Sequence, residues 1–395
     1  MASVAMRQPA EGSDIENAGF AAPFVFSGAG GTLVGHGAGC SLAPTAAGSL
    51  AAAVEAFWKE QRHATLLVGA LPFDRTAAAH LYAPESVSAA APIGKVRSLP
   101  RAAGGWTSIA EPPAATYADS VARALALLND EAAALRKVVL ARSLLVTAPH
   151  AIDLDAVLTR LAQDSTITTY AVPLPAAASG APRTLVGASP ELLVDKRGGT
   201  VRSAPLAGSA RRHADAAADR ASADGLLHSE KDLREHAFVV EAILDTLTPY
   251  CRALSAPEGP SLVSTASMWH LGTAIDGELK DPAVSVVELA AALHPTPAVC
   301  GLPRATAREA IATLEDFDRG FYAGAVGWAD RAGDGRWMVA IRCAEFSGAT
   351  ARLYAGAGIV PGSDPESEVA ETSAKFAALL AALGIDEAGR TQEPR

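Results

Sequence analysis

The stretch WMVAIRCAEFSGATARLYAGAGIV, residues 337–360, and the segment that follows it decide the fold class. Two apolar runs flank the short sequence SGAT, which predicts two β-strands joined by a turn. From Asp364 to Leu383 the apolar residues recur at helical spacing, so a helix is expected there. Strands and a helix in this order favour a mixed α+β fold.

The same alternation extends along the whole chain. Further strand-like segments, each with glycine or proline nearby, are FVFSG (24–28), TLLVGALPF (65–73), KVVLARSLLV (137–146), TLVGASPELLV (184–194) and AGAVGWA (323–329). Helical patterns lie between them at residues 117–135, 153–161, 229–247 and 305–314. Strands spread this widely predict large sheets.

The chain offers one candidate connection between two portions of a single large unit. Residues 89–113 are rich in proline and turn-forming residues, and they separate an N-terminal portion, residues 1–100, from residues 101–395. Residues 204–225 mix small, acidic and basic residues without a clear period, which predicts a loop that enters a helix. The first twenty residues predict a loose start, because acidic residues and a proline interrupt the apolar run that a secretory signal needs.

Composition argues against several classes of protein. The chain has 395 residues, with 33 Lys and Arg against 43 Asp and Glu, and a net charge of −10 without a long basic run; nucleic acid is therefore not an expected partner. Its four cysteines are far apart and form no CxxC, which favours neither a zinc site nor a disulfide framework and suits a reducing cytoplasm. The alanine-rich runs fall short of the roughly 18 apolar residues that a membrane span requires.

Two predicted helices carry carboxylates that could bind a metal ion. Ser229 begins SEKDLREH as a candidate N-cap, and Glu235 lies near the edge of the apolar stripe of that helix. Glu368, Glu371 and Lys375 share one face of the last helix. Carboxylates from two helices suit Mg²⁺, which prefers oxygen ligands. The alternatives are a solvated helix face at Glu235 and an ordinary surface ion pair between Glu371 and Lys375.

Two further charged residues stand in apolar surroundings. Glu191 follows a proline between two apolar segments, and a carboxyl group whose pKa is raised by burial can act as a general acid. Lys137 begins an apolar strand, where burial favours the neutral amine that a general base requires. Either residue could equally be an ordinary charge at the end of a strand.

The segment LHPTPAVCGLPR, residues 293–304, is either a catalytic or metal-binding loop or a stiff connection. Its prolines fix its path, and no base for Cys300 lies nearby in the sequence, so a nucleophilic cysteine is not expected. His294 is a poor candidate ligand for Mg²⁺, which prefers oxygen. GAGIV, residues 356–360, lacks the spacing of a dinucleotide-binding turn.

Taken in order, the motifs are more specific than any one of them. KVVLAR, GASPELL, PLAGSARR, SEKDLREH, WHLGT, LHPTPAVCGLPR, FDRGFYAGAVGW and the ExxETxxK tail resemble the chorismate-utilising enzymes, which include isochorismate synthase, salicylate synthase, anthranilate synthase component I and aminodeoxychorismate synthase. The resemblance covers residues 137–383, and GALPFD (69–74) extends it weakly toward the N-terminus.

The resemblance implies an α+β chorismate-binding fold like that of anthranilate synthase component I, with two facing sheets, surrounding helices and a central cleft. Residues 101–395 would form the catalytic region. A Mg²⁺ ion would anchor the ring carboxylate of chorismate on Glu235 and Glu371, with Glu368 close by. Glu191 would be the general acid and Lys137 the general base. The residues implied to line the substrate pocket are Gly208, Ser209, His270, Arg342, Tyr354, Gly356 and Lys375.

Within the family, the motifs most resemble isochorismate synthases of catecholate siderophore pathways, which supply 2,3-dihydroxybenzoate. Lys137 would deprotonate a water for attack at ring C2 while Glu191 protonates the departing C4 hydroxyl. Amine-transferring members typically lack this lysine, and Ala207 stands where aminodeoxychorismate synthases carry a lysine nucleophile. Salicylate synthase, a menaquinone-pathway isochorismate synthase and an inactive chorismate-binding paralogue are the alternatives. No amidotransferase subunit is expected, and we expect a monomer.

Overall fold

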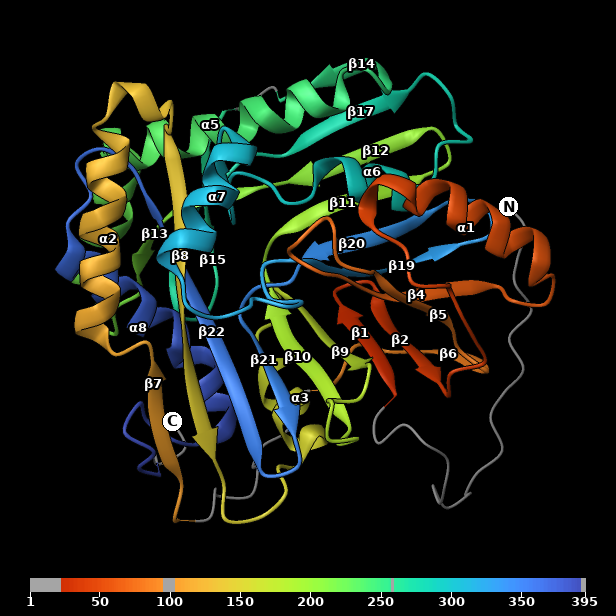
Figure 1. Ribbon diagram of the computed structural model, residues 1–395, viewed down its shortest axis with the longest axis horizontal. Helices are drawn as coiled ribbons and strands as arrows, with labels where there is room; N and C mark the ends of the chain where they lie inside the picture. Colours follow the sequence, from red (N-terminus) through yellow and green to blue (C-terminus); the bar gives the residue numbers. More distant parts are fainter. Residues whose placement is uncertain (1–22, 95–103, 257–258, 392–395) are drawn as a thin grey trace.

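The computed structural model describes residues 23–94, 104–256 and 259–391, and these form a mixed α+β unit. Two large sheets and one small sheet account for the strands, and every paired strand runs antiparallel to its neighbour. In Figure 1 the strands β14, β17, β12 and β11 occupy the upper part of the molecule, and β21, β10 and β9 the lower part. The predicted α+β class with two facing sheets is confirmed.

The first large sheet has ten strands. In spatial order they are β18 (Gly301–Leu302), β8 (Lys137–Thr147), β22 (Thr350–Ile359), β21 (Cys343–Ser347), β10 (Arg183–Ser189), β9 (Thr168–Leu174), β1 (Phe24–Gly28), β2 (Gly31–His36) and β6 (Ser86–Ala90), with β7 (Thr107–Glu111) beside β8. The longest pairing joins β8 to β22 and runs from Thr147 opposite Thr350 to Val138 opposite Ile359.

The second large sheet has nine strands, and the small sheet has three. The nine are β14 (Cys251–Ser255), β17 (Ile275–Leu279), β12 (Thr200–Ala204), β11 (Leu192–Arg197), β20 (Gly335–Val339), β19 (Ala325–Asp330), β4 (Leu66–Leu71), β5 (His80–Ala83) and β3 (Cys40–Ser41). The three are β13 (Leu206–Arg211), β16 (Met268–Gly272) and β15 (Ser261–Ser264). Strands from residues 23–94 therefore belong to both large sheets. The predicted division at residue 100 falls within 95–103, which lie outside the described residues, as do residues 1–22.

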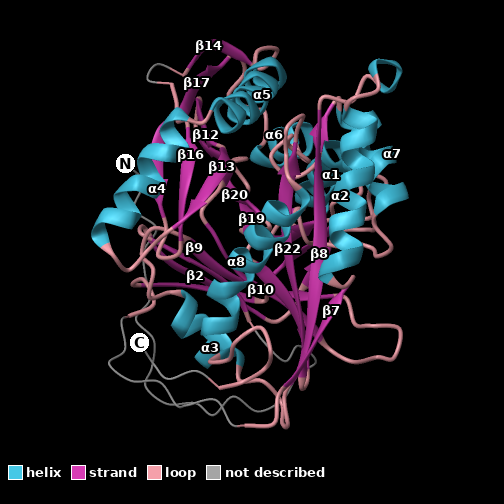
Figure 2. Cartoon of the chain, turned by 90° about the vertical axis from the view of Figure 1, so that its left-hand side faces the viewer, coloured by secondary structure: helices cyan, strands magenta, loops and turns pink. Residues whose placement is uncertain are grey.

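The helices surround the strands (Figure 2). They are α1 (Leu50–Glu60), α2 (Ala114–Leu128), α3 (Leu154–Leu161), α4 (Ala216–His228), α5 (Glu230–Leu247), α6 (Val286–Leu293), α7 (Arg304–Leu314) and α8 (Pro365–Leu383), with short 3₁₀ turns η1 (Ala47–Ser49) and η2 (Glu131–Ala133). Helix α8 packs on β22 and α2, whereas α5 packs on β13 and α6 packs on β11. Among the described helices, none combines the length and the apolar character that a membrane span requires.

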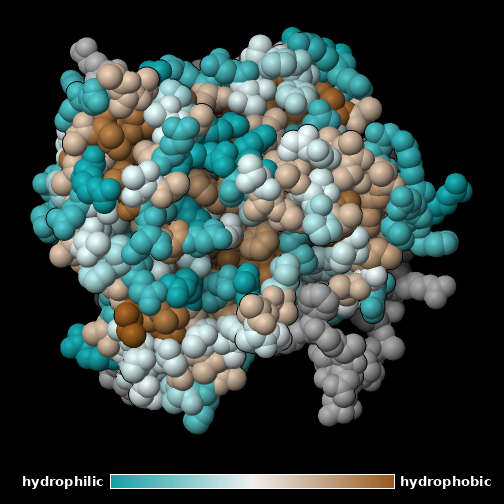
Figure 3. Space-filling view, viewed as in Figure 1, coloured by the Kyte–Doolittle hydropathy of each residue, from teal (hydrophilic) through white to brown (hydrophobic). Residues whose placement is uncertain are grey.

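Side chains of the ten-stranded sheet alternate between two cores. Phe24 and Phe26 of β1 point into the core that this sheet shares with the nine-stranded sheet, where fully buried Trp337 also lies. Val25, between the two phenylalanines, points instead into a second core under α3 and α8, which contains fully buried Phe376. The sheet is thus buried on both faces, and α8 is held on it by apolar packing. Over the face seen in Figure 3, polar and apolar residues are interspersed.

The structure corrects two strand predictions. TLVGASPELLV and WMVAIRCAEF each look like one strand in the sequence, but the chain leaves β10 at Ser189 to enter β11 and leaves β20 at Val339 to enter β21. In both cases it passes from one large sheet to the other. Pro190 cannot donate a backbone hydrogen bond, which suits a strand end. These two crossings place Glu191 and Arg342 between the sheets.

The helix predictions hold except at one element and one loop. The helix predicted at residues 117–135 is α2, which begins earlier, at Ala114, and ends earlier, at Leu128, with Pro113 at its N-cap and Asn129 at its C-cap. Residues 204–225 do enter a helix, α4, as predicted, but the part before it is not simply a loop, since it contains β13, which pairs with β16. The predicted N-cap of α5 is confirmed: the Ser229 hydroxyl accepts a hydrogen bond from the backbone of Asp232 at 3.3 Å.

Candidate active site

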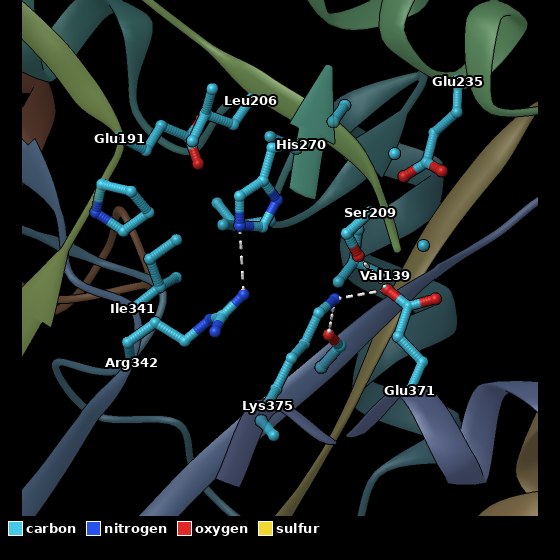
Figure 4. A pocket seen from close by; sticks show the side chains of 18 of the residues that line it. Val139, Glu191, Leu206, Ser209, Glu235, His270, Ile341, Arg342, Glu371 and Lys375 are labelled. Atoms are coloured by element: carbon cyan, nitrogen blue, oxygen red, sulfur yellow. Dashed lines mark hydrogen bonds and ion pairs between the residues drawn. The ribbon is translucent and has the colours of Figure 1, made fainter. Parts of the chain in front are cut away.

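A pocket between the large sheets, β13 and α8 collects most of the residues that the sequence singled out. It encloses about 690 Å³, including its open mouth. Ten of the twelve predicted site residues line it: Glu191, Gly208, Ser209, Glu235, His270, Arg342, Tyr354, Gly356, Glu371 and Lys375. Figure 4 labels seven of these side chains and shows them around one cavity: Glu191, Ser209, Glu235, His270, Arg342, Glu371 and Lys375. Lys137 and Glu368 are buried but are not among the lining residues.

Lys137 contacts the pocket through Glu235. Its Nζ lies 3.0 Å from Oε1 of Glu235, and the lysine is fully buried. Gly358 of β22 makes the pairing possible, because a Cβ at this position would overlap Oε1 of Glu235 and come within 3.2 Å of Cε of Lys137. The alternative of a solvated helix face at Glu235 is wrong, since that residue is only 7% exposed.

Helix α8 contributes a second ion pair to the pocket. Oε1 of Glu371 lies 2.6 Å from Nζ of Lys375 and accepts a hydrogen bond from the Ser209 hydroxyl at 2.9 Å. Lys375 also donates to the carbonyl of Gly356 at 2.8 Å. Burial favours the protonated carboxyl, but the Lys375 ammonium and the Ser209 hydroxyl outweigh it and hold the pKa of Glu371 below its usual 4.5. This ion pair faces the pocket and is not an ordinary surface pair.

Glu368 lies one turn from Glu371 and forms a third such pair. Lys231 of α5 donates to Oε1 of Glu368 at 3.3 Å, whereas the buried Oε2 has no hydrogen-bond partner among the described residues. Burial and the nearby Glu371 carboxylate raise the pKa of Glu368 to about 7. Each of the three glutamates thus contacts its own lysine. As the side chains stand, no three His, Cys, Asp or Glu among the described residues form a cluster that could hold a metal ion.

The donor set nevertheless has the chemistry of a hard-cation site. Glu235 and Glu371 line the same pocket and offer only oxygen atoms, and the orphaned Oε2 of Glu368 is a buried acceptor in need of a donor or a cation. The donor atoms of these residues are therefore of the type that Mg²⁺ binds.

Glu191 is buried at the crossing between β10 and β11. Within the part of the chain that the structure describes, its Oε1 has no hydrogen-bond partner. Burial raises the pKa of the carboxyl group to about 8, although the backbone of Leu206 and the Lys137 ammonium act in the opposite direction. At neutral pH the group is mainly protonated. A protonated carboxyl that lines a pocket is able to donate a proton to a bound molecule.

A histidine and an arginine also line the pocket. Burial and the Arg342 guanidinium hold the pKa of His270 well below its usual value, so the ring is neutral. Arg342 approaches Nε2 of this ring at 3.4 Å, and the ring also bonds to the backbone of Gly208. Burial lowers the pKa of Arg342 to about 10, which leaves it charged at neutral pH. Its backbone has φ +51°, which accompanies the crossing between the sheets.

The apolar part of the pocket was only partly predicted. Tyr354, which was predicted, stacks on Tyr322 with ring centroids 4.8 Å apart and an interplanar angle of 9°. Tyr322 lines the pocket but was not singled out, although it lies within the motif FDRGFYAGAVGW. Ala207, which the sequence analysis named, also lines the pocket. Further lining residues that the sequence did not single out are Val139, Pro190, Leu206, Ala298, Val299, Ile341, Ala355 and Gly358. Their ordinary apolar character gave no signal.

The segment LHPTPAVCGLPR shapes the pocket. The His294 ring bonds to the carbonyl of Pro72 at 2.9 Å, and burial lowers the pKa of His294 to about 3, so this residue is a neutral anchor. Burial raises the pKa of the Cys300 thiol to about 11, which argues against a nucleophile. Between them, Ala298 and Val299 line the pocket. The segment is therefore a stiff wall, as predicted.

Comparison with known proteins places the chain in a family. Residues 55–384 match the model for the family described as chorismate binding enzyme. Isochorismate synthase DhbC of Bacillus subtilis (strain 168) is 48% identical over 348 residues, which cover 87% of this chain and 86% of the relative.

Solved structures agree. The crystal structure of DhbC from Bacillus anthracis, assigned as a 2,3-dihydroxybenzoate-specific isochorismate synthase, has a TM-score of 0.86 and 42% identity, covering 92% of this chain and 96% of that one. Anthranilate synthase component I of Streptococcus pneumoniae TIGR4 shares the fold, with a TM-score of 0.66 at 19% identity over 94% of this chain and 95% of that one. The chain belongs to the chorismate-binding enzyme family.

Proposed function

We propose that this protein is an isochorismate synthase, which converts chorismate reversibly to isochorismate. The observation that carries the proposal is a protonated buried carboxyl at Glu191, which lines the pocket, together with a buried amine at Lys137, which contacts the lining residue Glu235. Such a pair suits a reaction in which one hydroxyl leaves and another arrives. The 48% identity to an isochorismate synthase along 87% of the chain supports the same reaction.

Glu191 would act as the acid. Exchange of the hydroxyl group from C4 to C2 requires that a poor leaving group depart, and protonation of the C4 oxygen makes it leave as water. Because burial raises the pKa of Glu191 to about 8, the proton is available at neutral pH. Oε1, which has no partner among residues 23–94, 104–256 and 259–391, would contact the substrate.

Lys137 would act as the base. It would accept a proton from the water that attacks C2, and the reverse reaction would use the same two residues with their roles exchanged. Its contact with Glu235 holds the amine in place, since Nζ has no hydrogen-bond partner besides this ion-pair contact among the described residues. In the charged state of this pair the lysine must release its proton before it can act.

The charged walls would bind the two carboxylates of chorismate. Arg342 and Lys375 supply positive charge on the pocket surface, and the neutral His270 ring directs the Arg342 guanidinium. Mg²⁺ would be held by Glu235 and Glu371 with Glu368 close by, and it would supply positive charge that neutralises the ring carboxylate.

The biological setting forms part of the proposal. The DhbC relatives favour an enzyme that supplies 2,3-dihydroxybenzoate for a catecholate siderophore over one that serves menaquinone. All four cysteines are free, which suits a cytoplasmic enzyme. We propose a monomer without an amidotransferase subunit.

An isotope experiment tests the proposed reaction. In water enriched in ¹⁸O, with chorismate and Mg²⁺, the enzyme should release isochorismate that carries one ¹⁸O at C2, because the new hydroxyl comes from solvent. Continued incubation should also label the C4 hydroxyl of the recovered chorismate through the reverse reaction. Isochorismate without the label would refute water attack at C2.

A further inference from the structure

The structure contains a buried arginine outside the pocket whose hydrogen bonds reach one functional helix. Arg142 of β8 is 1% exposed, although an arginine is seldom buried without a strong partner. Its ion-pair partner, Glu387, is 43% exposed and lies 3.7 Å away, which makes the pair weak. Apolar rings complete the surroundings, with the guanidinium 5.2 Å from the Phe376 ring centroid and 5.9 Å from that of Tyr117.

The hydrogen bonds of this guanidinium to other described residues end on a single turn of α8. Nε donates to the hydroxyl of Thr372 at 2.9 Å, and one terminal nitrogen donates to the hydroxyl of Ser373 at 2.6 Å and to the carbonyl of Val369 at 3.4 Å. Thr372 is fully buried and donates in turn to backbone carbonyls of the preceding turn of the helix. The guanidinium therefore bonds to α8 within the same two turns that carry the charged residues of the site, Glu368, Glu371 and Lys375.

The backbone of Arg142 belongs to a strand that pairs with the pocket wall. Arg142 lies opposite Ala355 in the β8–β22 pairing, and the neighbouring Ala141 lies opposite Gly356. Ala355 and Gly356 both line the pocket, and the Gly356 carbonyl accepts the hydrogen bond from Lys375. The arginine thus connects the strand that forms the wall with the helix that supplies the charges. Its planar fork constrains both the rotation and the depth of the helix, which an apolar side chain would not do.

We propose that Arg142 is a positioning residue, which acts through Thr372 and Ser373 to set where Glu371 and Lys375 stand in the pocket. Apolar packing of α8 on the second core holds the helix on the sheet without it. An apolar residue at position 142 would therefore leave a folded protein whose helix can slide or turn. Misplacement of a catalytic group by roughly 1 Å can cost about 100-fold in rate.

The test compares two arginines that bond to the same helix at different turns. Arg160 donates to the carbonyl of Ala382 at 3.0 Å, near the end of α8 remote from Glu371. R142M, R142K and R160M are assayed for kcat and KM with chorismate and Mg²⁺, for chorismate Kd by calorimetry without metal, and for Tm, with kinetics measured well below the lowest Tm. Because the activity arm rests on the proposed function, the wild-type enzyme is assayed first and reports on that function by itself.

We expect R142M to lower kcat/KM by about tenfold or more and to weaken chorismate binding. R142K should recover part of the loss, since an ammonium donates to one hydroxyl but lacks the fork. R160M should lower Tm while kcat/KM stays within about twofold of wild type. Equal Tm losses in R142M and R160M with unchanged kcat/KM and Kd in both would overturn the proposal.

The single variant T372V keeps the proposal testable if R142M does not fold. T372V removes the acceptor of Nε without changing the arginine, and it should lower kcat/KM in the same direction. Where R142M folds, the double variant R142M/T372V should lose no more activity than R142M alone. Fully additive losses, or a T372V enzyme with wild-type kcat/KM and Kd, would mean that Arg142 does not act through this helix turn.

Discussion

Nζ of Lys137 lies 3.0 Å from Oε1 of Glu235, inside a protein in which the lysine is fully buried. The two residues are distant in sequence, one at the start of β8 and the other in the second turn of α5, and they meet because Gly358 leaves space between them. The contact joins the proposed base to a proposed metal ligand. Changes on either side of it should therefore affect the chemistry more than the fold.

Replacement of Lys137 by alanine should abolish turnover while the protein stays folded. The base is lost, and the Glu235 carboxylate loses its partner, which should also reduce Tm. The matched control is Lys196→Ala, because Lys196 is equally buried and pairs with Asp334 at 2.7 Å outside the pocket. The control should lose stability but keep kcat, and near-normal kcat in the Lys137 variant would remove the base assignment.

Gly358→Ala should inactivate the enzyme by sterics alone. A Cβ at this position would overlap Oε1 of Glu235, so the carboxylate must leave its place. Gly225→Ala is the control, since nothing lies within 4 Å of a Cβ there and alanine is favoured in the helix. Turnover and Tm of both variants decide the point: an active Gly358 variant would show that the Lys137–Glu235 contact is not needed.

The pH dependence should report Glu191. The carboxyl group must be protonated to act as the acid, so kcat should fall as the pH rises through about 8. Glu191→Gln should bind chorismate but turn it over slowly, and its kcat should not fall as the pH rises through about 8. Binding measured by calorimetry across the same pH range serves as the control.

The ionisation of Glu191 should also make the stability of the fold depend on pH. Burial raises the pKa of Glu191 from its ordinary 4.5 to about 8. Between these two pH values the carboxyl group is protonated in the folded protein but ionised in the unfolded chain. This contribution to stability is present below that window and is lost as the pH rises through it. Tm should therefore decline less steeply with pH in Glu191→Gln than in the wild type, and identical slopes would contradict the buried acid.

The carboxylates of α5 and α8 should govern the response to metal. Glu235→Ala and Glu371→Ala should each raise the Mg²⁺ concentration needed for half-maximal activity or abolish activity, because the ion loses an oxygen ligand. Asp276→Ala, which breaks an exposed ion pair with Arg202, provides the control and should titrate like wild type. If metal titrations of the two glutamate variants match that of the control, the proposed ligands are wrong.

Cys300→Ala should keep kcat. The buried thiol packs in the core of the pocket wall, so its loss should cost about 1 kcal/mol of stability through a small cavity. Val299, its neighbour, should still line the pocket. A large fall in kcat at unchanged Tm would show that the thiol takes part in the reaction.

The charged part of the site could be predicted because charge in apolar surroundings is visible in a sequence. Glu191 follows a proline between apolar segments, and Lys137 opens an apolar strand, so each is conspicuous in the sequence alone. The spacing of Glu368, Glu371 and Lys375 likewise placed them on one helix face. The family motifs then supplied the roles that spacing alone left open.

What the sequence could not predict are the relationships that arise from chain crossings and from space. The strands that end before Glu191 and Arg342 look continuous, because apolar periodicity does not reveal a change of sheet. The i,i+4 spacing indicated the pair of Glu371 with Lys375, but no pattern paired Glu235 with Lys137 or Glu368 with Lys231. Tyr322, although inside a family motif, gave no separate signal, since a buried tyrosine usually belongs to an ordinary core.

The measurement that tests the central claim most directly is the analysis of products by liquid chromatography and mass spectrometry, with chorismate, Mg²⁺ and the purified protein alone. The account predicts an isomer of unchanged mass that approaches an equilibrium mixture with chorismate. Salicylate with pyruvate, or chorismate left unchanged while a known synthase converts it under the same conditions, would contradict the account.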